Sequence, residues 1–433
     1  MVDAMEKCDQ LGSIDTPIET CCLNAEWHAR PGMRLKKDTR VTHIVTDKTV
    51  DIMPLVFENT SANGLPEWAV QARHQLIDAD GFSVKWEQHT ETNCFTFSAP
   101  KSSEEYFCES PYDFLPAELA SAIKADQKIG VRLEIIASDK VEAVGGFTEA
   151  QAILGCRTIY GGFMSDNHAA VWTSLLLDAD GFIRILVVDI KLSEGRLSRL
   201  VHRLLDIETY RYLAMSALPV ARETMEKLDK LEPELDALVL SMANKSETDQ
   251  EKLLFQIADI AARAEHIVSV TAYRFAAAKA YEDIVLRRMS EIREGILDGH
   301  LRYTVFLDRS FRPAMRTCEA AGKRAEALTH RVSRAANLLN TMVDMALKRQ
   351  SHSILQSMEK QASTQVRLQQ AVEGFSIFAI SYYGVGLIAY VVKAVKSAGL
   401  SLPTDGIVGI FVPLVIAVSW ASVRLVKKRS VKQ

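Results

Sequence analysis

The sequence predicts an α+β N-terminal domain, followed by a long-helix bundle or stalk and a C-terminal two-helix transmembrane hairpin. Three observations predict this order. Short β-branched runs alternate with turn residues up to about residue 190. Proline and glycine then become sparse over 194–373, where Leu, Ala, Glu, Arg and Lys dominate. Two apolar runs, 374–392 and 406–426, follow. We therefore expect a flexible N-terminus (1–20), an α/β domain (21–193), a helical domain (194–373), a hairpin (374–426) and a basic tail (427–433).

Within the first domain, five short runs are rich in β-branched or aromatic residues and are expected to be strands: 41–46, 82–87, 94–98, 131–137 and 182–190. Segments 66–79 and 116–126 have helical spacing, and each starts with a proline, which suits a first helical turn. The pentapeptide Asp-Ala-Asp-Gly-Phe occurs at 78–82 and again at 178–182. Both copies lead into an expected strand, so each predicts a tight turn with glycine at positive φ.

The helical domain is expected to contain four helices, at 194–217, 220–244, 247–297 and 313–373, because Pro219, Pro233, Gly295, Gly299 and Pro313 are plausible breaks. The last helix would be about 90 Å long at 1.5 Å per residue. It carries apolar residues that step by four and three, which predicts a coiled-coil-like seam: Leu328, Val332, Ala335, Leu339, Met342 and Ala346. It continues into the first apolar run with no breaker before Gly374.

Each apolar run has about the 20 residues that a helix needs to cross a hydrocarbon core. A helix satisfies its backbone within its own segment, so a helical hairpin is the expected form in the lipid bilayer. The end of the second run and the tail after it include Arg424, Lys427 and Lys428 and no acid, which predicts a cytoplasmic C-terminus. A hairpin returns to the side that it left, so the N-terminus and both soluble domains are expected to be cytoplasmic as well. The first 20 residues lack the apolar stretch of a secretory signal.

The hairpin contains residues suited to helix packing. Gly384 and Gly386 follow Tyr382 and Tyr383 in the first run, and the second run offers Ala417 and Ala421, four residues apart. Small residues allow two membrane helices to approach closely. Tyrosines at this depth need hydrogen-bond partners, so we expect both to face protein.

Composition narrows the possible functions. The net charge is −4 and no long basic run occurs before the C-terminus, so we expect no nucleic-acid partner. Seven cysteines without C-x-x-C spacing predict neither a disulfide framework nor a zinc site, and fit a reducing compartment. No phosphate-binding loop, dinucleotide fingerprint, nucleophile elbow or H-E-x-x-H motif is present. We therefore nominate no catalytic residue, metal ligand set or cofactor, and lean against an enzyme.

One polar concentration stands out in the N-terminal half. It comprises Glu26, His28, Arg30, Arg40, His43, Glu87, His89 and Glu91. On a strand, residues spaced by two project from one face, so two histidines and several carboxylates would converge if the strands were neighbours. Such a group could be a metal or acid–base site, or Arg30 and Arg40 could bind an anion or nucleotide. The third interpretation is structural polar packing.

Several longer motifs resemble a bacterial family of membrane-anchored proteins catalogued as the domain of unknown function 3422. These motifs begin at Glu26, Trp86, Gly195, Ala217 and Val372, and the resemblance extends from about Cys21 to Gly399. One departure is Trp27, where the family usually has a smaller apolar residue. The resemblance implies a location at the bacterial inner membrane and no particular activity.

Three functions are therefore considered. The first is a non-enzymatic, homo-oligomeric scaffold or sensor that presents its cytoplasmic α/β domain at the inner membrane, with an unknown small-molecule ligand. The second is a CorA-like channel or transporter, a class with a comparable architecture. Its Gly-Met-Asn signature is absent between the two runs, where the chain continues from Val392 to Gly399. The third is a membrane-tethered enzyme that uses Glu26, His28 and His89.

Overall fold

The protein was analysed as a computed structural model, which describes residues 32–48, 74–79, 81–137, 146–242, 250–297, 299–397 and 404–430. The chain divides into two compact units. The first comprises Met1–Ala243 and Phe255–Arg334, and the second comprises Asn244–Leu254 and Ala335–Gln433. The first unit thus joins the expected α/β domain with much of the helical domain.

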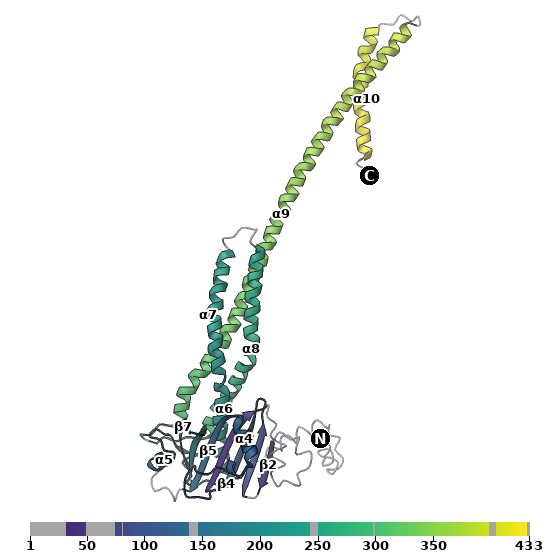
Figure 1. Cartoon of the computed structure of the whole chain (residues 1–433). Coiled ribbons are helices and arrows are strands. Elements are labelled where there is room, and N and C mark those ends of the chain that lie inside the picture. Colours follow the sequence, from purple (N-terminus) through teal and green to yellow (C-terminus); the bar gives the residue numbers. More distant parts are fainter. Residues whose placement is uncertain are drawn as a thin grey trace, which may run out of the picture. The chain divides into compact units, whose positions relative to one another are not determined.

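An eight-stranded mixed sheet organises the first unit (Figure 1). Across the sheet its strands are β2 (His74–Ala79), β3 (Phe82–Gln88), β4 (Thr92–Pro100), β1 (Thr39–Asp47), β5 (Gln127–Ala137), β8 (Phe182–Asp189), β7 (Ala169–Leu177) and β6 (Tyr160–Met164). Strands β5 and β8 are parallel, and every other neighbouring pair is antiparallel. All five strands expected from the sequence are confirmed.

The repeated pentapeptide forms two hairpin turns, as predicted. Gly81 and Gly181 have φ values of 88° and 83°, and they connect the antiparallel pairs β2–β3 and β7–β8. In the second copy, Asp178 Oδ1 accepts hydrogen bonds from the backbone N–H groups of Asp180 (3.0 Å) and Phe182 (2.9 Å). The aspartate therefore holds the turn closed while glycine supplies the left-handed conformation.

The two faces of the sheet have separate cores because alternate residues of a strand face opposite sides. On one face, here called the α6 side, aliphatic residues pack against helix α6 (Glu194–Met215); this core includes Val41, Val131, Leu200 and Leu204. On the other, here called the α4–α5 side, the short helices α4 (Ala117–Ala125) and α5 (Phe147–Leu154) cover two aromatic cores. These cores include Phe95, Phe97 and Trp172.

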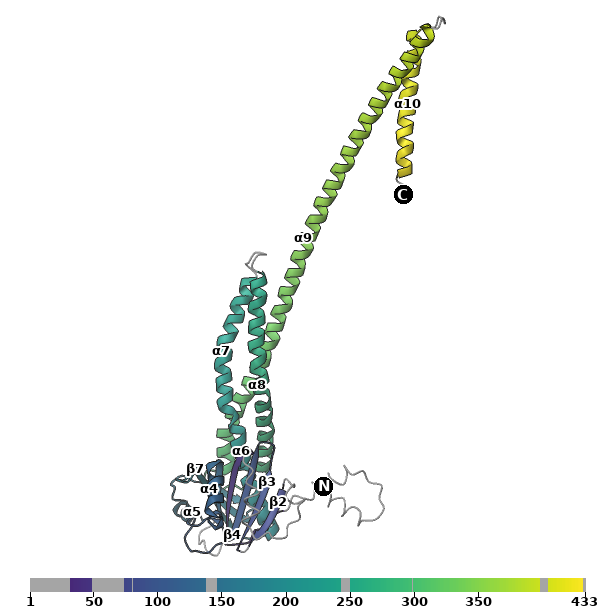
Figure 2. The ribbon, with the colours of Figure 1, turned by 45° about the vertical axis from the view of Figure 1, so that its right-hand side comes forward.

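Helices α7 (Ala217–Met242), α8 (Gln250–Glu291) and the first part of α9 (Tyr303–Ser397) run side by side in both views (Figures 1 and 2). Buried leucines along α7, such as Leu228 and Leu235, supply much of the packing. Ion pairs join the helices at their surfaces: Arg324 of α9 contacts Glu232 of α7 at 2.8 Å, and Arg263 of α8 contacts Glu234. The exposed pair of Arg263 and Glu234 contributes little stability, so burial of the leucines dominates the packing.

The connection between α8 and α9 covers the β6 edge of the sheet. Backbone hydrogen bonds join Gly161 N–H to the Leu301 carbonyl at 3.0 Å and Gly295 N–H to the Phe163 carbonyl at 2.8 Å. A third joins Ser165 N–H to the Ile292 carbonyl at 2.9 Å. The edge strand therefore has hydrogen-bond partners on both sides.

The second unit contains the later part of α9 and the helix α10 (Thr404–Ser430). Within α9 lies a segment that is long and apolar enough to cross a membrane, and few of its side chains are buried. The apolar part of α10, Gly409–Ser422, is shorter. The two helices touch where Gly384 lies beside Val415, since a Cβ on Gly384 would be 2.8 Å from Val415 Cγ1.

Several sequence-based expectations were wrong in detail. Residues 74–79 form strand β2 and not the end of a helix; the rest of the expected helix at 66–73 lies outside the described residues. Strands β6 and β7 and helix α5 were not predicted. Pro233 and Pro313 lie inside α7 and α9 and do not end them.

Candidate functional site

The predicted polar cluster is divided by the sheet. Within β1, Arg40 projects to the α4–α5 side with Ile44, whereas His43 projects to the α6 side with Val41 and Val45. Both side chains are buried. Glu26, His28 and Arg30 lie outside the described residues.

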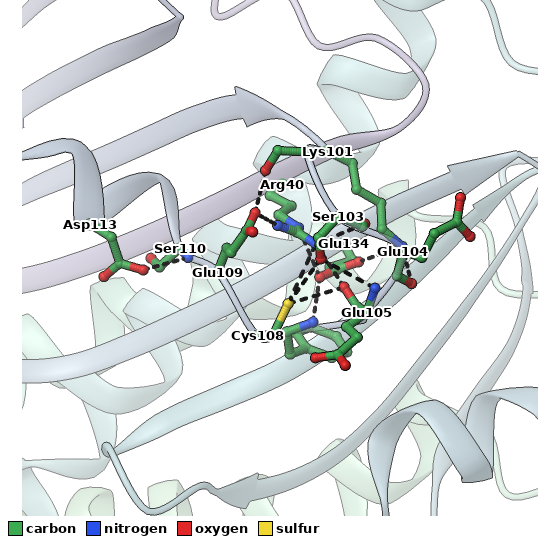
Figure 3. A network of polar contacts seen from close by, with 12 residues as sticks. Arg40, Lys101, Ser103, Glu104, Glu105, Cys108, Glu109, Ser110, Asp113 and Glu134 are labelled. Carbon is green, nitrogen blue, oxygen red and sulfur yellow. Dashed lines mark hydrogen bonds and ion pairs between the residues drawn. The ribbon is translucent and has the colours of Figure 1, made fainter.

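Arg40 is the centre of a polar network under the loop that joins β4 to the short helix η2 (Pro111–Phe114) (Figure 3). Its Nη2 donates to the backbone carbonyls of Glu105 (2.7 Å) and Ser103 (3.2 Å), and its Nη1 donates to Glu109. Its Nε lies 3.3 Å from Glu134 Oε1. The guanidinium is thus surrounded by acceptors of this chain, which leaves little capacity for the anion considered from the sequence.

Glu134 connects this loop to the centre of the sheet. It lies on β5 opposite Arg40 of β1, and it is almost wholly buried. Its Oε1 accepts a hydrogen bond of 2.5 Å from Phe107 N–H, and its Oε2 lies 3.7 Å from Lys101 Nζ. One carboxylate therefore balances two cations and fixes the loop that covers them.

On the α6 side, His43 is held between the sheet and helix α6. Its Nδ1 is 2.8 Å from Thr96 Oγ1 of β4, and its Nε2 is 2.9 Å from Thr209 Oγ1 of α6. Complete burial lowers the pKa of His43 to about 3, against a smaller opposing effect from the Glu87 carboxylate. The ring is therefore neutral at physiological pH, with one nitrogen donating and the other accepting.

The remaining candidates line the same side. Burial opposes ionisation of Glu87, but the Lys85 ammonium at 2.8 Å outweighs it and lowers the pKa of Glu87 below its usual value. Beyond the end of β3, His89 contacts the rings of His74 and Tyr210, with centroid distances of 6.4 and 6.0 Å.

Glu91 lies in the turn before β4, and its Oε2 is 3.0 Å from Arg274 Nη1 of α8. His43 and Glu87 thus lie on the α6 side of the sheet, and His89 and Glu91 contact helices α6 and α8 through Tyr210 and Arg274. Each has a partner within the chain. No group of three or more His, Cys, Asp or Glu side chains in the described part of the chain has the arrangement of a metal site.

Sequence reasoning missed the residues that complete these networks. Thr96, Thr209, Lys85 and Glu134 come from four different elements, and Thr209 is 166 positions away from the histidine that it contacts. A threonine or lysine in a strand carries no signal of such a role. Cys94 is buried, and burial raises the pKa of its thiol.

In the apolar parts of α9 and α10, the predicted packing residues differ in their surroundings. Gly384 adjoins α10, but nothing lies within 4 Å of a Cβ placed on Gly386. Tyr382 and Tyr383 are 73% and 72% exposed, so within this chain they do not face protein. Ala417 and Ala421 are also exposed. The face between the helices instead contains Ser381 and Ser419, both buried, because helical spacing places them one turn from the Gly384–Val415 contact.

The chain was also compared with known proteins. No curated protein matches it. The sequence profile of one family matches residues 21–430, which include the sheet and the long helices through α10. The chain therefore belongs to the family described as protein of unknown function (DUF3422).

Proposed function

We propose that this protein is a membrane-anchored, non-enzymatic scaffold or sensor that presents its α/β unit at the cytoplasmic face of a bacterial inner membrane. The observation that carries the proposal is the exposed apolar segment of α9. Phe375, Phe378 and Tyr390 are each 77% exposed, and Leu387 is 67% exposed. Apolar surface of this extent is unfavourable in water and favourable in a hydrocarbon core.

In this proposal α9 and α10 form a transmembrane hairpin. The contact of Gly384 with Val415 supports it, because a glycine at a helix crossing allows close approach in lipid. The apolar part of α10 is shorter than a usual span. The sequence near its end contains basic residues, such as Arg424 and Lys427, which favour a cytoplasmic location of that end.

The proposal also includes self-association through α9. Between the bundle and the apolar segment, one face of the helix carries Leu347, Ile354, Met358, Leu368 and Val372, all more than half exposed. Their spacing fits seam positions of a heptad, with Ser351, Gln361 and Gln365 at the three intervening seam positions. We propose that the partner is a second copy of this chain. All copies inserted in one membrane have the same orientation, so the same seam residues of each copy lie at the same distance from the bilayer.

Two experiments test the proposal. Truncation after Glu373 should move the protein from the membrane to the soluble fraction, and a reporter active only in the periplasm should give no signal when fused to Gln433. Membrane retention of the truncated chain, or a periplasmic signal, would contradict the anchor or its topology respectively.

Self-association is tested by the native mass of the detergent-solubilised chain. The double variant Ile354→Glu with Leu368→Glu should lower the mass to that of one chain, since both substitutions place acids in the seam. The matched control, Gln356→Glu with Gln370→Glu, adds two acids on the opposite face and should retain the assembly. A monomeric wild-type chain, or equal native masses for the two double variants, would refute self-association through this seam.

A further inference from the structure

A pocket of about 320 Å³ opens beside β6 and β7 in the first unit, where the last turns of α6 and the first turns of α9 approach the sheet. Its volume lies near the lower end of small-molecule sites, roughly 300–1,000 Å³. Most of its wall is apolar and includes Leu175, Met215, Phe306, Leu307 and Phe311. The Tyr160 ring stacks on Phe306, with centroids 3.9 Å apart, and this contact makes the aromatic wall rigid.

Arg211 is the one charged side chain among the residues lining this pocket. Its Nε donates to Glu208 Oε2 at 3.1 Å, and its Nη2 donates to the same oxygen. Glu208 is fully buried, and its Oε1 accepts a hydrogen bond of 2.8 Å from the buried Tyr303 hydroxyl. The guanidinium is therefore fixed in orientation from behind.

The other edge of this guanidinium is available. Among the described residues, no hydrogen bond involves Arg211 Nη1, although its two N–H groups belong to a side chain that lines the pocket. A fixed arginine with free donors in an apolar wall is the arrangement that recognises a planar oxygen acceptor.

A second, independent feature marks the same place. Leu175 has a φ of 56°, which is strained for a leucine, and the pairing of β7 with β8 shifts register between Thr173 and Leu177. The bulge turns Leu175 into the pocket wall and leaves Leu176 65% exposed at its margin. Strain of this kind persists at sites whose shape serves a ligand.

We propose that this pocket binds a small amphipathic carboxylate. Its alkyl or aryl body lies against Phe306 and Leu307, and its carboxylate accepts hydrogen bonds from Arg211 Nη1. Glu208 leaves this contact open, because it accepts hydrogen bonds from Nε and Nη2 of the guanidinium and not from Nη1. Ligand binding at this site goes beyond the scaffold role and does not depend on the membrane anchor.

The test uses the full chain in lipid nanodiscs, with empty nanodiscs as the blank, and three probes that share one body: 4-phenylbutyrate, 4-phenylbutyramide and 4-phenylbutylamine. Titration calorimetry should show saturable binding of the carboxylate. The neutral amide should bind at least about tenfold more weakly, and the amine should not bind, because only the carboxylate forms charge-assisted hydrogen bonds with Arg211.

The variant Ser310→Trp places a large side chain in the pocket from an exposed position of α9, so the fold should tolerate it. It should weaken carboxylate binding at least about tenfold, since the body loses its space. The control Arg309→Trp puts the same side chain on the adjacent exposed position outside the pocket wall and should leave binding unchanged. Absence of saturable carboxylate binding, equal affinity for all three probes, or unaltered binding in Ser310→Trp would each overturn the proposal.

Discussion

The buried pair of Arg40 and Glu134 should contribute strongly to the folding of the first unit. The side chains are 4% and 3% exposed, and Glu134 also faces Lys101. Glu134→Gln keeps the size of the side chain and an acceptor for Phe107 N–H, but it removes the carboxylate that Arg40 and Lys101 share. The half-exposed Glu109 then remains as an ion-pair partner of Arg40. Removing one partner of a buried pair costs about 3–5 kcal/mol. Because Glu109 remains, we expect the lower end of that range, about 3 kcal/mol.

The assay is urea unfolding of the detergent-solubilised chain, followed by the fluorescence of its tryptophans. Trp86 and Trp172 are buried in the two cores on the same side of the sheet as Arg40. With a urea m value of about 3 kcal/mol/M, a loss of about 3 kcal/mol in unfolding free energy lowers the urea midpoint by roughly 1 M.

The matched control is Glu104→Gln, which removes an exposed carboxylate from the same loop and should shift the midpoint little. The double variant Arg40→Met with Glu134→Leu removes both charges of the pair. Its loss of unfolding free energy should be smaller, by about 2 kcal/mol or more, than the summed losses of Arg40→Met alone and Glu134→Leu alone. A midpoint for Glu134→Gln equal to that of the control, or strictly additive costs, would show that the pair does not hold the loop to the sheet.

Three further predictions concern other parts of the molecule. His43 has a pKa of about 3 when folded and an ordinary one near 6.5 when unfolded, so its stabilising effect is complete above pH 6.5 and declines as the pH falls. Between pH 7.5 and 5, the wild type should lose roughly 2 kcal/mol more unfolding free energy than His43→Gln, and equal losses would contradict this assignment. Tyr303→Phe removes a hydrogen bond to the buried carboxylate of Glu208 and should lower thermal stability by about 1–3 kcal/mol, measured by calorimetry. Gly384→Leu should separate α9 from α10, which a reduced yield of a disulfide between cysteines introduced at Ser381 and Ser419 would report; an unchanged yield would mean that the crossing does not need glycine.

Much of the secondary structure could be predicted, because its signals are local. The β-branched runs of β1, β5 and β8 and the low-glycine composition of the long helices each depend on neighbouring residues. Strand β2 was missed because its sequence, HQLIDA, alternates weakly and its place in the sheet depends on pairing with β3. Strand β6 was not predicted, because it is short and contains Gly161 and Gly162; a Cβ on Gly161 would collide with the backbone of Val171.

The helix breaks were misjudged for a different reason. A proline removes one helical hydrogen bond, but tertiary packing can offset that cost. Beside Pro313, the side chains of Phe311 and Met315 are buried in the core of the first unit, and this packing holds α9 through the proline.

The site residues were foreseen only in part. Spacing by two would place Glu87, His89 and Glu91 on one face of a strand, but β3 ends before His89. The separation of Arg40 from His43 follows from strand alternation and was available from the sequence, since the two are an odd number of positions apart. Their hydrogen-bond partners could not be predicted from the sequence, because the contact of His43 with Thr209, for example, depends on how α6 crosses the sheet.

The backbone contacts along β6 also give the first unit a mechanical property. Tyr303, the first residue of α9, follows two positions after Leu301, whose carbonyl is bonded to the edge strand. A force applied to the beginning of α9 would therefore act first on the hydrogen bond of Leu301. It would act next on the hydrogen bonds of Gly295 and Ile292, which lie further back along the same connection. These bonds would transmit tension from the helix directly into the sheet, so the edge strand is the element that would register a force applied to the helix.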